Sequence, residues 1–204
     1  MDLYCVMGNP VEHSRSPRIH ARFAQLCGQQ MEYGRRLVPL GAFAEGIAAF
    51  RSEAAERGDI ARGCNITVPF KLEAAALAQH ASERALLAQA VNTLRFEADG
   101  SVHADNTDGI GLVNDIVRNA GVPLQGKALL LIGAGGAAAG VLGPLLDAGA
   151  TRVVVANRTV EKAAELVRRH AAIALRQGAS LEAWAPWCSA HCRKPWAAAP
   201  YIMS

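Results

Sequence analysis

Residues 128–139 read Ala128-Leu129-Leu130-Leu131-Ile132-Gly133-Ala134-Gly135-Gly136-Ala137-Ala138-Ala139. The first five form an unbroken apolar run with the length of a buried strand. The next six, all glycine or alanine, suit a tight turn. Residues 139–148 follow as a small-residue and leucine segment that predicts a helix. The stretch therefore predicts strand, turn and helix, the unit from which parallel α/β sheets are built.

The spacing of the glycines adds a function to that fold. Gly133-x-Gly135-x-x-Ala138 matches the dinucleotide-binding fingerprint with alanine in the third place. Gly133 permits the turn, Gly135 lets backbone amides approach a pyrophosphate, and the small Ala138 allows close packing of helix on strand. Amides at the start of the helix would then hold the phosphates. The cofactor-binding residues predicted in this turn are Gly133, Ala134, Gly135, Gly136 and Ala137.

The end of the next predicted strand, 152–156, indicates which nucleotide binds. An NAD site usually carries an acidic residue here for the ribose hydroxyls, but this chain reads Asn157-Arg158-Thr159. The planar guanidinium of Arg158 suits a phosphate, and Asn157 and Thr159 can add hydrogen bonds, which favours NADP over NAD. The alternative is that Thr159 caps the following helix and Arg158 is solvated. Lys162 either adds positive charge to this site or is simply exposed.

Upstream of the turn, strands and helices alternate. We expect strands at 4–8, 33–40 and 63–68, helices at 16–27, 42–57, 72–79, 82–89 and 110–120, and a hairpin around 98–100. Residues 121–126 have the character of a linker. The predicted fold class is α/β: a substrate-binding α/β domain over 1–122, a partial Rossmann (doubly wound) NADP-binding domain over 123–183, and an atypical tail over 184–204.

Composition excludes several classes of function. The 204 residues are 51% hydrophobic and carry a net charge of +3, which is too mild to indicate nucleic acid or a membrane surface as a partner. Five cysteines at irregular spacing indicate free thiols in a reducing cytoplasm, and the start of the chain lacks the regions of a signal peptide. Cys188-x-x-x-Cys192 with His191 faintly suggests zinc, but no second ligand pair follows, so we predict no metal.

A second informative stretch is Asn65-Ile66-Thr67-Val68-Pro69-Phe70-Lys71. It leads from a predicted buried strand through a proline turn to a lysine at a helix start. Alternation along the strand would place Asn65 and Thr67 on one face. A lysine held at a strand end is a candidate proton donor or acceptor, because its pKa shifts readily on desolvation. The alternative is an ordinary surface lysine.

Polar residues gather at four places in the N-terminal half. These are Ser14-Arg15-Ser16, the set Asn65, Thr67 and Lys71, the pair Asn92-Thr93, and Asn106-Thr107-Asp108-Gly109. Each has a simple structural explanation by itself, such as Ser16 capping a helix or Asp108 forming a turn. Together they supply hydroxyls, amides, one ammonium and one carboxylate, which suits a small polyhydroxylated acid.

These motifs, in this order, resemble those of shikimate dehydrogenases over residues 1 to about 170. The motifs are Asn9-Pro10 with Ser14-x-Ser16-Pro17, Asn65-x-Thr67-Val68-Pro69-x-Lys71, Ala90-Val91-Asn92-Thr93, Asn106-Thr107-Asp108-Gly109, Gly133-Ala134-Gly135-Gly136-Ala137 and Asn157-Arg158-Thr159. The resemblance implies reversible NADPH-dependent reduction of 3-dehydroshikimate to shikimate, a step toward chorismate and the aromatic amino acids, by a monomer or homodimer.

The resemblance also implies roles for single residues. Ser14 and Ser16 would bind the substrate carboxylate. Thr67, Asn92 and Asp108 would bind ring hydroxyls, with Asn65 in support. Lys71 would transfer the proton, paired with Asp108. Glu83 falls where the family places a residue near the cofactor, although a solvated helix carboxylate explains it equally well.

The chain departs from the family at its C-terminal end. It lacks the later Rossmann strands and the family's terminal Gly-x-x-x-x-x-x-Gln helix, and residues 184–204 contain all three tryptophans. We expect that a frameshift or gene-model error replaced the genuine sequence near Ala183. Two alternative functions follow: a non-catalytic remnant that binds shikimate-like acids, and a relative that oxidises quinate or shikimate with NAD.

Overall fold

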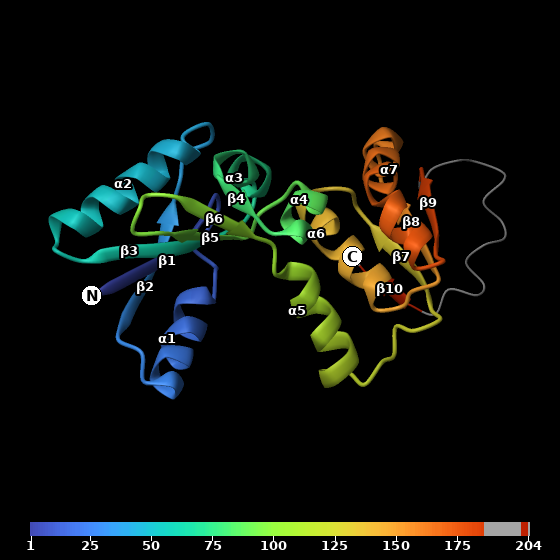
Figure 1. Cartoon of the computed structure of the whole chain (residues 1–204), viewed down its shortest axis with the longest axis horizontal. Coiled ribbons are helices and arrows are strands. Elements are labelled where there is room, and N and C mark those ends of the chain that lie inside the picture. Colours follow the sequence, from blue (N-terminus) through green and yellow to red (C-terminus); the bar gives the residue numbers. More distant parts are fainter. Residues whose placement is uncertain (186–200, 204) are drawn as a thin grey trace. The chain divides into compact units, whose positions relative to one another are not determined.

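The computed structural model describes residues 1–185 in full and the backbone of 201–203. Their packing forms two compact units, Met1–Asn106 and Thr107–Ser204, each of α/β type (Figure 1). Helix α5 (Asp108–Asn114) packs on helix α6 (Gly136–Asp147), which is why α5 groups with the second unit. Packing thus divides the chain before the linker at 121–126, and the domain boundary at 122/123 stays a prediction.

The first unit is built on a six-stranded mixed sheet with the order β2-β1-β3-β5-β6-β4. Strands β1, β2 and β3 are parallel, whereas β5 runs antiparallel to both β3 and β6. Helices α1 and α2 lie on opposite sides of this sheet in Figure 1. The elements are β1 (Asp2–Gly8), α1 (Ser16–Cys27), β2 (Met31–Leu37), α2 (Phe43–Glu56), β3 (Ile60–Ile66), α3 (Lys71–Leu77), β4 (His80–Ala81), α4 (Glu83–Ala88), β5 (Thr93–Phe96) and β6 (Val102–Asp105).

The core of the first unit holds the start of α3 in place. Alternate residues of β1 and β3 are buried against the aromatic residues of α2. Phe70 is 0% exposed, and its ring stacks on Phe43 with the centroids 5.1 Å apart. Full burial of such a ring stabilises a fold by about 1.5–3 kcal/mol. Because Phe70 immediately precedes Lys71, the core fixes the backbone position from which the Lys71 side chain extends.

The second unit is a parallel sheet with the order β10-β7-β8-β9. Its elements are β7 (Ala128–Ile132), α6, β8 (Arg152–Ala156), α7 (Val160–Arg176), β9 (Ser180–Trp184) and β10 (Tyr201–Met203). Strands β9, β8 and β7 follow the 3-2-1 order of a mononucleotide-binding half, and β10 lies on the other side of β7. The strand order therefore reverses between β7 and β10, the kind of position where doubly wound sheets bind ligands. The predicted Rossmann-type fold is confirmed.

Most element bounds agree with the sequence predictions, and the exceptions have local causes. Strand β3 ends at Ile66, so Val68 lies in the turn before the proline and is 63% exposed rather than buried. Helix α6 begins at Gly136, three residues earlier than expected. Glycine is a poor helix former, so the residue types at 136–138 did not indicate a helix. The predicted helix 110–120 is α5 followed by a π-helical turn at Asp115–Asn119, and β9 was not foreseen.

None of the helices in the described part of the chain combines the length and apolar character needed to span a bilayer.

Candidate active site

The two serines predicted to bind a carboxylate lie together where α1 begins. Ser14 Oγ donates to Ser16 Oγ over 3.1 Å, and the backbone N–H of Ser16 donates to Ser14 Oγ over 3.3 Å. The guanidinium of Arg35 donates twice to the Ser14 carbonyl oxygen, over 2.9 and 2.6 Å. Ser16 is not the N-cap that the sequence suggested, since Arg15 occupies that position and Ser16 is the first helical residue. Both hydroxyls are thus held at one helix start.

The side chain of Asn65 makes three hydrogen bonds, to Tyr33 on β2, to Thr93 on β5 and to the backbone of Asn92. Tyr33 Oη donates to Asn65 Oδ1 over 2.6 Å. Asn65 Nδ2 donates to the Asn92 carbonyl oxygen over 3.3 Å and to Thr93 Oγ1 over 3.2 Å. Both ends of this amide are therefore used within the protein, which suits a supporting role.

Asn92 is oriented in turn by Thr93, whose hydroxyl donates to Asn92 Oδ1 over 2.9 Å. Asn92 is only 9% exposed, and its backbone N–H donates to the Asp105 carbonyl oxygen over 3.1 Å. Because Asn92 Oδ1 accepts from Thr93, the position of the donor end of the amide is fixed. Sequence reasoning included Thr93 in a polar pair but missed Tyr33. A tyrosine in a predicted strand was the available signal, since a tyrosine hydroxyl that leaves water usually finds a hydrogen-bond partner.

Thr67 and Lys71 bracket the turn after β3. The backbone N–H of Thr67 donates to the Met7 carbonyl oxygen over 2.9 Å, so Thr67 stays beside β1 although it is past the end of β3. Lys71 is half-buried at the first position of α3. Its carbonyl oxygen accepts from the N–H of Val91 over 2.8 Å. Since Val91 precedes Asn92, this bond holds the lysine next to the segment that carries the predicted hydroxyl-binding amide.

A carboxylate behind this segment anchors it. Asp105 accepts from Ser82 Oγ over 2.6 Å, from Arg84 Nε over 2.7 Å and from the N–H of Asn106 over 2.7 Å. Burial raises the pKa of Asp105, but these hydrogen bonds outweigh it and the pKa lies below the ordinary value. Asn106, 1% exposed, donates to the Ala90 carbonyl oxygen over 2.8 Å. Asp105 and Asn106 therefore hold the strand that supports Asn92.

Two predicted residues cannot be assigned to this cluster. Asp108 is the first residue of α5 and belongs to the second unit, so its pairing with Lys71 stays a prediction. Glu83 is exposed at the first position of α4, which Ser82 caps by accepting from the N–H of Ala85. The cofactor role of Glu83 also stays a prediction.

The glycine turn of the second unit has the form that the fingerprint requires. Gly133 has a φ of +109°, a conformation that favours glycine, and its N–H donates to the Ala156 carbonyl oxygen over 2.7 Å. A Cβ added to Gly135 would meet no described atom within 4 Å, so the space above this residue is open. Ala138 is buried in the first turn of α6. An open approach to backbone amides at the start of a 12-residue helix fits the pyrophosphate of a dinucleotide.

The residues after β8 leave a guanidinium exposed. Asn157 Nδ2 donates to the Thr159 carbonyl oxygen over 2.7 Å and so braces the turn. Thr159 is the N-cap of α7, but its side chain makes no capping hydrogen bond, contrary to the capping alternative. Arg158 and Lys162 are exposed. The turn therefore offers positive charge and no carboxylate where a nucleotide ribose would lie.

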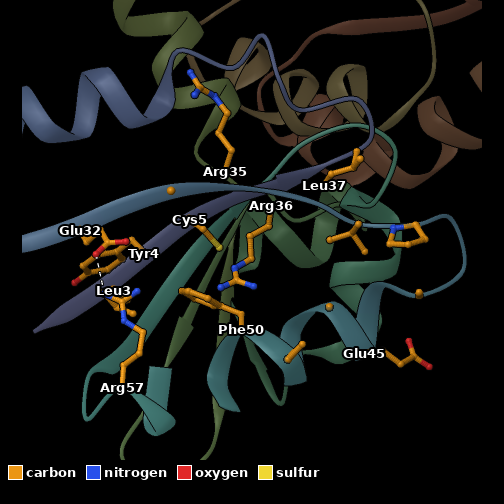
Figure 2. Close-up of a pocket in the computed structure, with 16 residues that line it drawn as sticks. Leu3, Tyr4, Cys5, Glu32, Arg35, Arg36, Leu37, Glu45, Phe50 and Arg57 are labelled. Atoms are coloured by element: carbon orange, nitrogen blue, oxygen red, sulfur yellow. Dashed lines mark hydrogen bonds and ion pairs between the residues drawn. The ribbon is translucent and has the colours of Figure 1, made fainter. Parts of the chain in front are cut away.

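A cavity of about 570 Å³ beside β2 and α2 holds none of the predicted site residues (Figure 2). Arg35 and Arg36 leave β2 on opposite sides there, and only Arg35 points away from α2. Arg36 lies over the Phe50 ring, 4.9 Å from its centroid, and pairs with Glu53 at 2.5 Å. Because that guanidinium is already paired, we assign the cavity no part in binding.

Among residues 1–185, no group of three His, Cys, Asp or Glu side chains could hold a metal ion. The pair Cys188 and Cys192, with His191, lies outside the described residues, as does most of the tail at 184–204.

Comparison with known proteins matches both halves of the chain to one family. The family described as shikimate dehydrogenase substrate binding domain matches residues 6–94, and the family described as shikimate/quinate 5-dehydrogenase matches residues 115–182. A shikimate dehydrogenase (NADP(+)) of Paracidovorax citrulli is 62% identical over 89% of this chain and 63% of its own length. One of Acidovorax sp. is 63% identical over 88% of this chain and 61% of its own length.

Solved structures are similar to this chain over most of its length. An Ael1 enzyme from Pseudomonas putida is 44% identical with a TM-score of 0.77, covering 91% of this chain and 64% of its own. Shikimate 5-dehydrogenase from Thermus thermophilus, in complex with NADP(H) and shikimate, is 32% identical with a TM-score of 0.71, covering 89% and 62%. The chain thus spans somewhat under two thirds of the length of these relatives. On these matches and the site geometry, the chain belongs to the shikimate dehydrogenase family.

Proposed function

We propose that the protein catalyses the reversible reduction of 3-dehydroshikimate to shikimate with NADPH. The observation that carries the proposal is the position of Lys71, which the Phe70 anchor and the bond from Val91 hold beside Asn92. The relatives named shikimate dehydrogenase (NADP(+)) support the same reaction.

In this proposal the first unit binds the acid. The hydroxyls of Ser14 and Ser16 donate to the carboxylate, which must be hydrogen-bonded when it leaves water. Thr67 and Asn92, together with Asp108, bind the ring hydroxyls, and Asn65 keeps Asn92 in position. A site built to hydrogen-bond hydroxyls rejects analogues that lack them, because its polar groups would then be unpaired.

Lys71 transfers the proton. NADPH, when bound, supplies a hydride to the ketone carbon. As the C=O bond becomes C–O, the ammonium of Lys71 donates a proton to the oxygen, and in the reverse direction the amine accepts it. Asp108 is the proposed partner of Lys71 in this step.

NADP is the proposed cofactor, held by the turn Gly133, Ala134, Gly135, Gly136 and Ala137. Arg158 would pair with the 2′-phosphate, with Asn157, Thr159 and Lys162 around it. The open space above Gly135 and the exposed Arg158 support this assignment.

The Lys71→Ala variant tests the proposal. We expect the rate of NADPH oxidation with 3-dehydroshikimate to fall about 10³-fold, because general acid catalysis typically contributes 10²–10⁴-fold. The thermal shift produced by shikimate should change much less. Lys127→Ala, which removes a lysine of the second unit, is the matched control and should keep full activity. Equal losses of turnover and of shikimate affinity in Lys71→Ala would show that the lysine only binds.

The same assay separates the alternatives. Stabilisation by shikimate without turnover in the wild-type chain selects a non-catalytic remnant, and turnover of quinate or shikimate with NAD preferred selects the quinate-type relative. The state of assembly, monomer or homodimer, and the cytoplasmic location stay predictions.

A further inference from the structure

Side-chain contacts connect the two ends of the proposed substrate site. Ser14 donates to Ser16, His20 four residues further along α1 stacks on the Tyr33 ring, and hydrogen bonds lead from Tyr33 through Asn65 and Thr93 to Asn92. The first two residues are the proposed carboxylate ligands, and the last is a proposed ligand of the ring hydroxyls. Tyr33 lies between them and is the residue to which no function has so far been given.

We propose that Tyr33 is a positioning residue that couples the carboxylate-binding serines to the hydroxyl-binding Asn65–Asn92 end of the site. The inference rests on the proposed function, because the coupled residues are the proposed ligands of the acid.

The topology explains why a tyrosine is used. Strand β1 lies between β2, which carries Tyr33, and β3, which carries Asn65. The side chain must therefore cross about two strand spacings, roughly 10 Å in total. A long, rigid ring that ends in a hydroxyl spans this gap, with Asn65 meeting it partway at 2.6 Å.

Helix α1 holds the ring in the orientation that the bond requires. The imidazole of His20 stacks on the Tyr33 ring, with the centroids 4.3 Å apart and the planes within 2°. His20 comes four residues after Ser16, so both lie on one face of α1. The helix that begins at the serines therefore also holds the Tyr33 ring in place. Burial lowers the pKa of His20, which favours a neutral ring in this stack.

The direction of each bond follows from the one before. Burial raises the pKa of Tyr33, so its hydroxyl stays protonated, and its one proton goes to Asn65 Oδ1. With Asn65 Oδ1 occupied, Asn65 Nδ2 faces Thr93, and Thr93 donates to Asn92 Oδ1. Removing the Tyr33 hydroxyl leaves Asn65 Oδ1 without its donor and releases the amide to rotate.

The Tyr33→Phe variant keeps the ring and removes only the hydroxyl. We expect the Kd and KM for shikimate to rise about tenfold while kcat changes less than threefold, because the loss acts on binding geometry. Tyr4→Phe is the matched control, since Tyr4 is the register partner of Tyr33 on β1 and takes no part in the line of bonds among the described residues. It should bind shikimate as the wild type does.

Nitrogen-15 spectra of the chain without substrate give a second readout that does not depend on activity. In Tyr33→Phe, the side-chain amide signals of both Asn65 and Asn92 should move, whereas Tyr4→Phe should leave them in place. His20→Ala should weaken shikimate binding and His20→Phe, which can still stack, should restore most of it. Unchanged shikimate affinity in Tyr33→Phe, or an Asn92 signal that stays in place, overturns the inference. A wild-type chain that does not bind shikimate overturns the proposed function first and this inference with it.

Discussion

The candidate sites of the two units are built in different ways. In the first unit the candidate site is made of side chains held by hydrogen bonds, one set at the start of α1 and one set that joins β2, β3 and β5. In the second, the candidate site is a turn of backbone amides in which Gly133 and Gly135 matter because they lack side chains. A ring acid with several hydroxyls requires directed donors and acceptors, whereas a pyrophosphate is satisfied by convergent N–H groups. Substitutions should therefore act through different properties in the two units.

The largest effect is expected from Gly63→Ala in the first unit. A Cβ on Gly63 would lie 2.3 Å from the backbone carbonyl oxygen of Leu94, where β3 pairs with β5. Because backbone must move to relieve the clash, the free energy of unfolding should fall by about 3 kcal/mol. The same movement would displace Asn65 from Thr93, so shikimate binding should be lost as well. Thermal unfolding and a shikimate titration measure both.

Gly34→Ala is the control for that experiment. Gly34 lies on edge strand β2, and a Cβ there would meet no described atom within 4 Å. Its stability should stay within about 0.5 kcal/mol of the wild type. If Gly63→Ala were as stable as Gly34→Ala, the close approach of β3 and β5 would have no role in holding the site.

The matching change in the second unit, Gly135→Ala, should separate binding from stability. Gly135 has a φ of −89° and open space around it, so alanine fits the fold without strain. The added methyl group would occupy the space through which a pyrophosphate approaches the amides. We expect NADP to bind at least tenfold more weakly, about 1.4 kcal/mol, with an unchanged melting temperature.

Gly111→Ala tests whether that loss is specific. Gly111 lies in α5 of the same unit, and a Cβ there would also meet no described atom within 4 Å. Alanine should leave NADP binding unchanged and stabilise the helix by up to about 1 kcal/mol. Equal NADP affinity in Gly135→Ala and Gly111→Ala would argue against a pyrophosphate at the turn.

The same contrast explains what could be predicted from the sequence. The bounds of β7 and β8 and the place of the glycine turn follow from a continuous apolar run and local glycine spacing, which depend on neighbours in the chain. The bond from Tyr33 to Asn65 joins residues 32 positions apart, and it exists only because the strand order is β2-β1-β3. No local pattern specifies that order. Likewise, β10 pairs with β7 although the sequence of the tail gives no sign of a Rossmann strand.

The smallest effect is a difference in how the two units respond to mild acid. In the second unit, His170 is 0% exposed, its Nδ1 lies 2.9 Å from the Leu166 carbonyl oxygen, and its Nε2 has no partner among the described residues. Burial lowers its pKa, so the folded state keeps the ring neutral while the unfolded chain protonates it near the ordinary value of 6.5. Stability that is present above that value is therefore lost as the pH falls below it. The carboxyl of Asp105 in the first unit also has a lowered pKa, but its contribution is lost only as the pH falls below the ordinary value of 3.8.

Burial also lowers the pKa of His20 in the first unit, but that ring is only half-buried, whereas His170 is fully buried. Between pH 7.5 and pH 5, then, the second unit should lose more stability than the first. Residues 1–106 contain no tryptophan, and Trp184 of the second unit packs on Leu130, Val154 and Ala156, so tryptophan fluorescence reports the unfolding of this unit. Its transition should shift to lower temperature at pH 5, and His170→Leu should reduce the shift, because leucine fills the site without a group to protonate. A wild-type transition that does not depend on pH over this range, or an equal shift in His170→Leu, would place the acid sensitivity outside His170. The two units would then differ in how they bind but not in how they respond to acid.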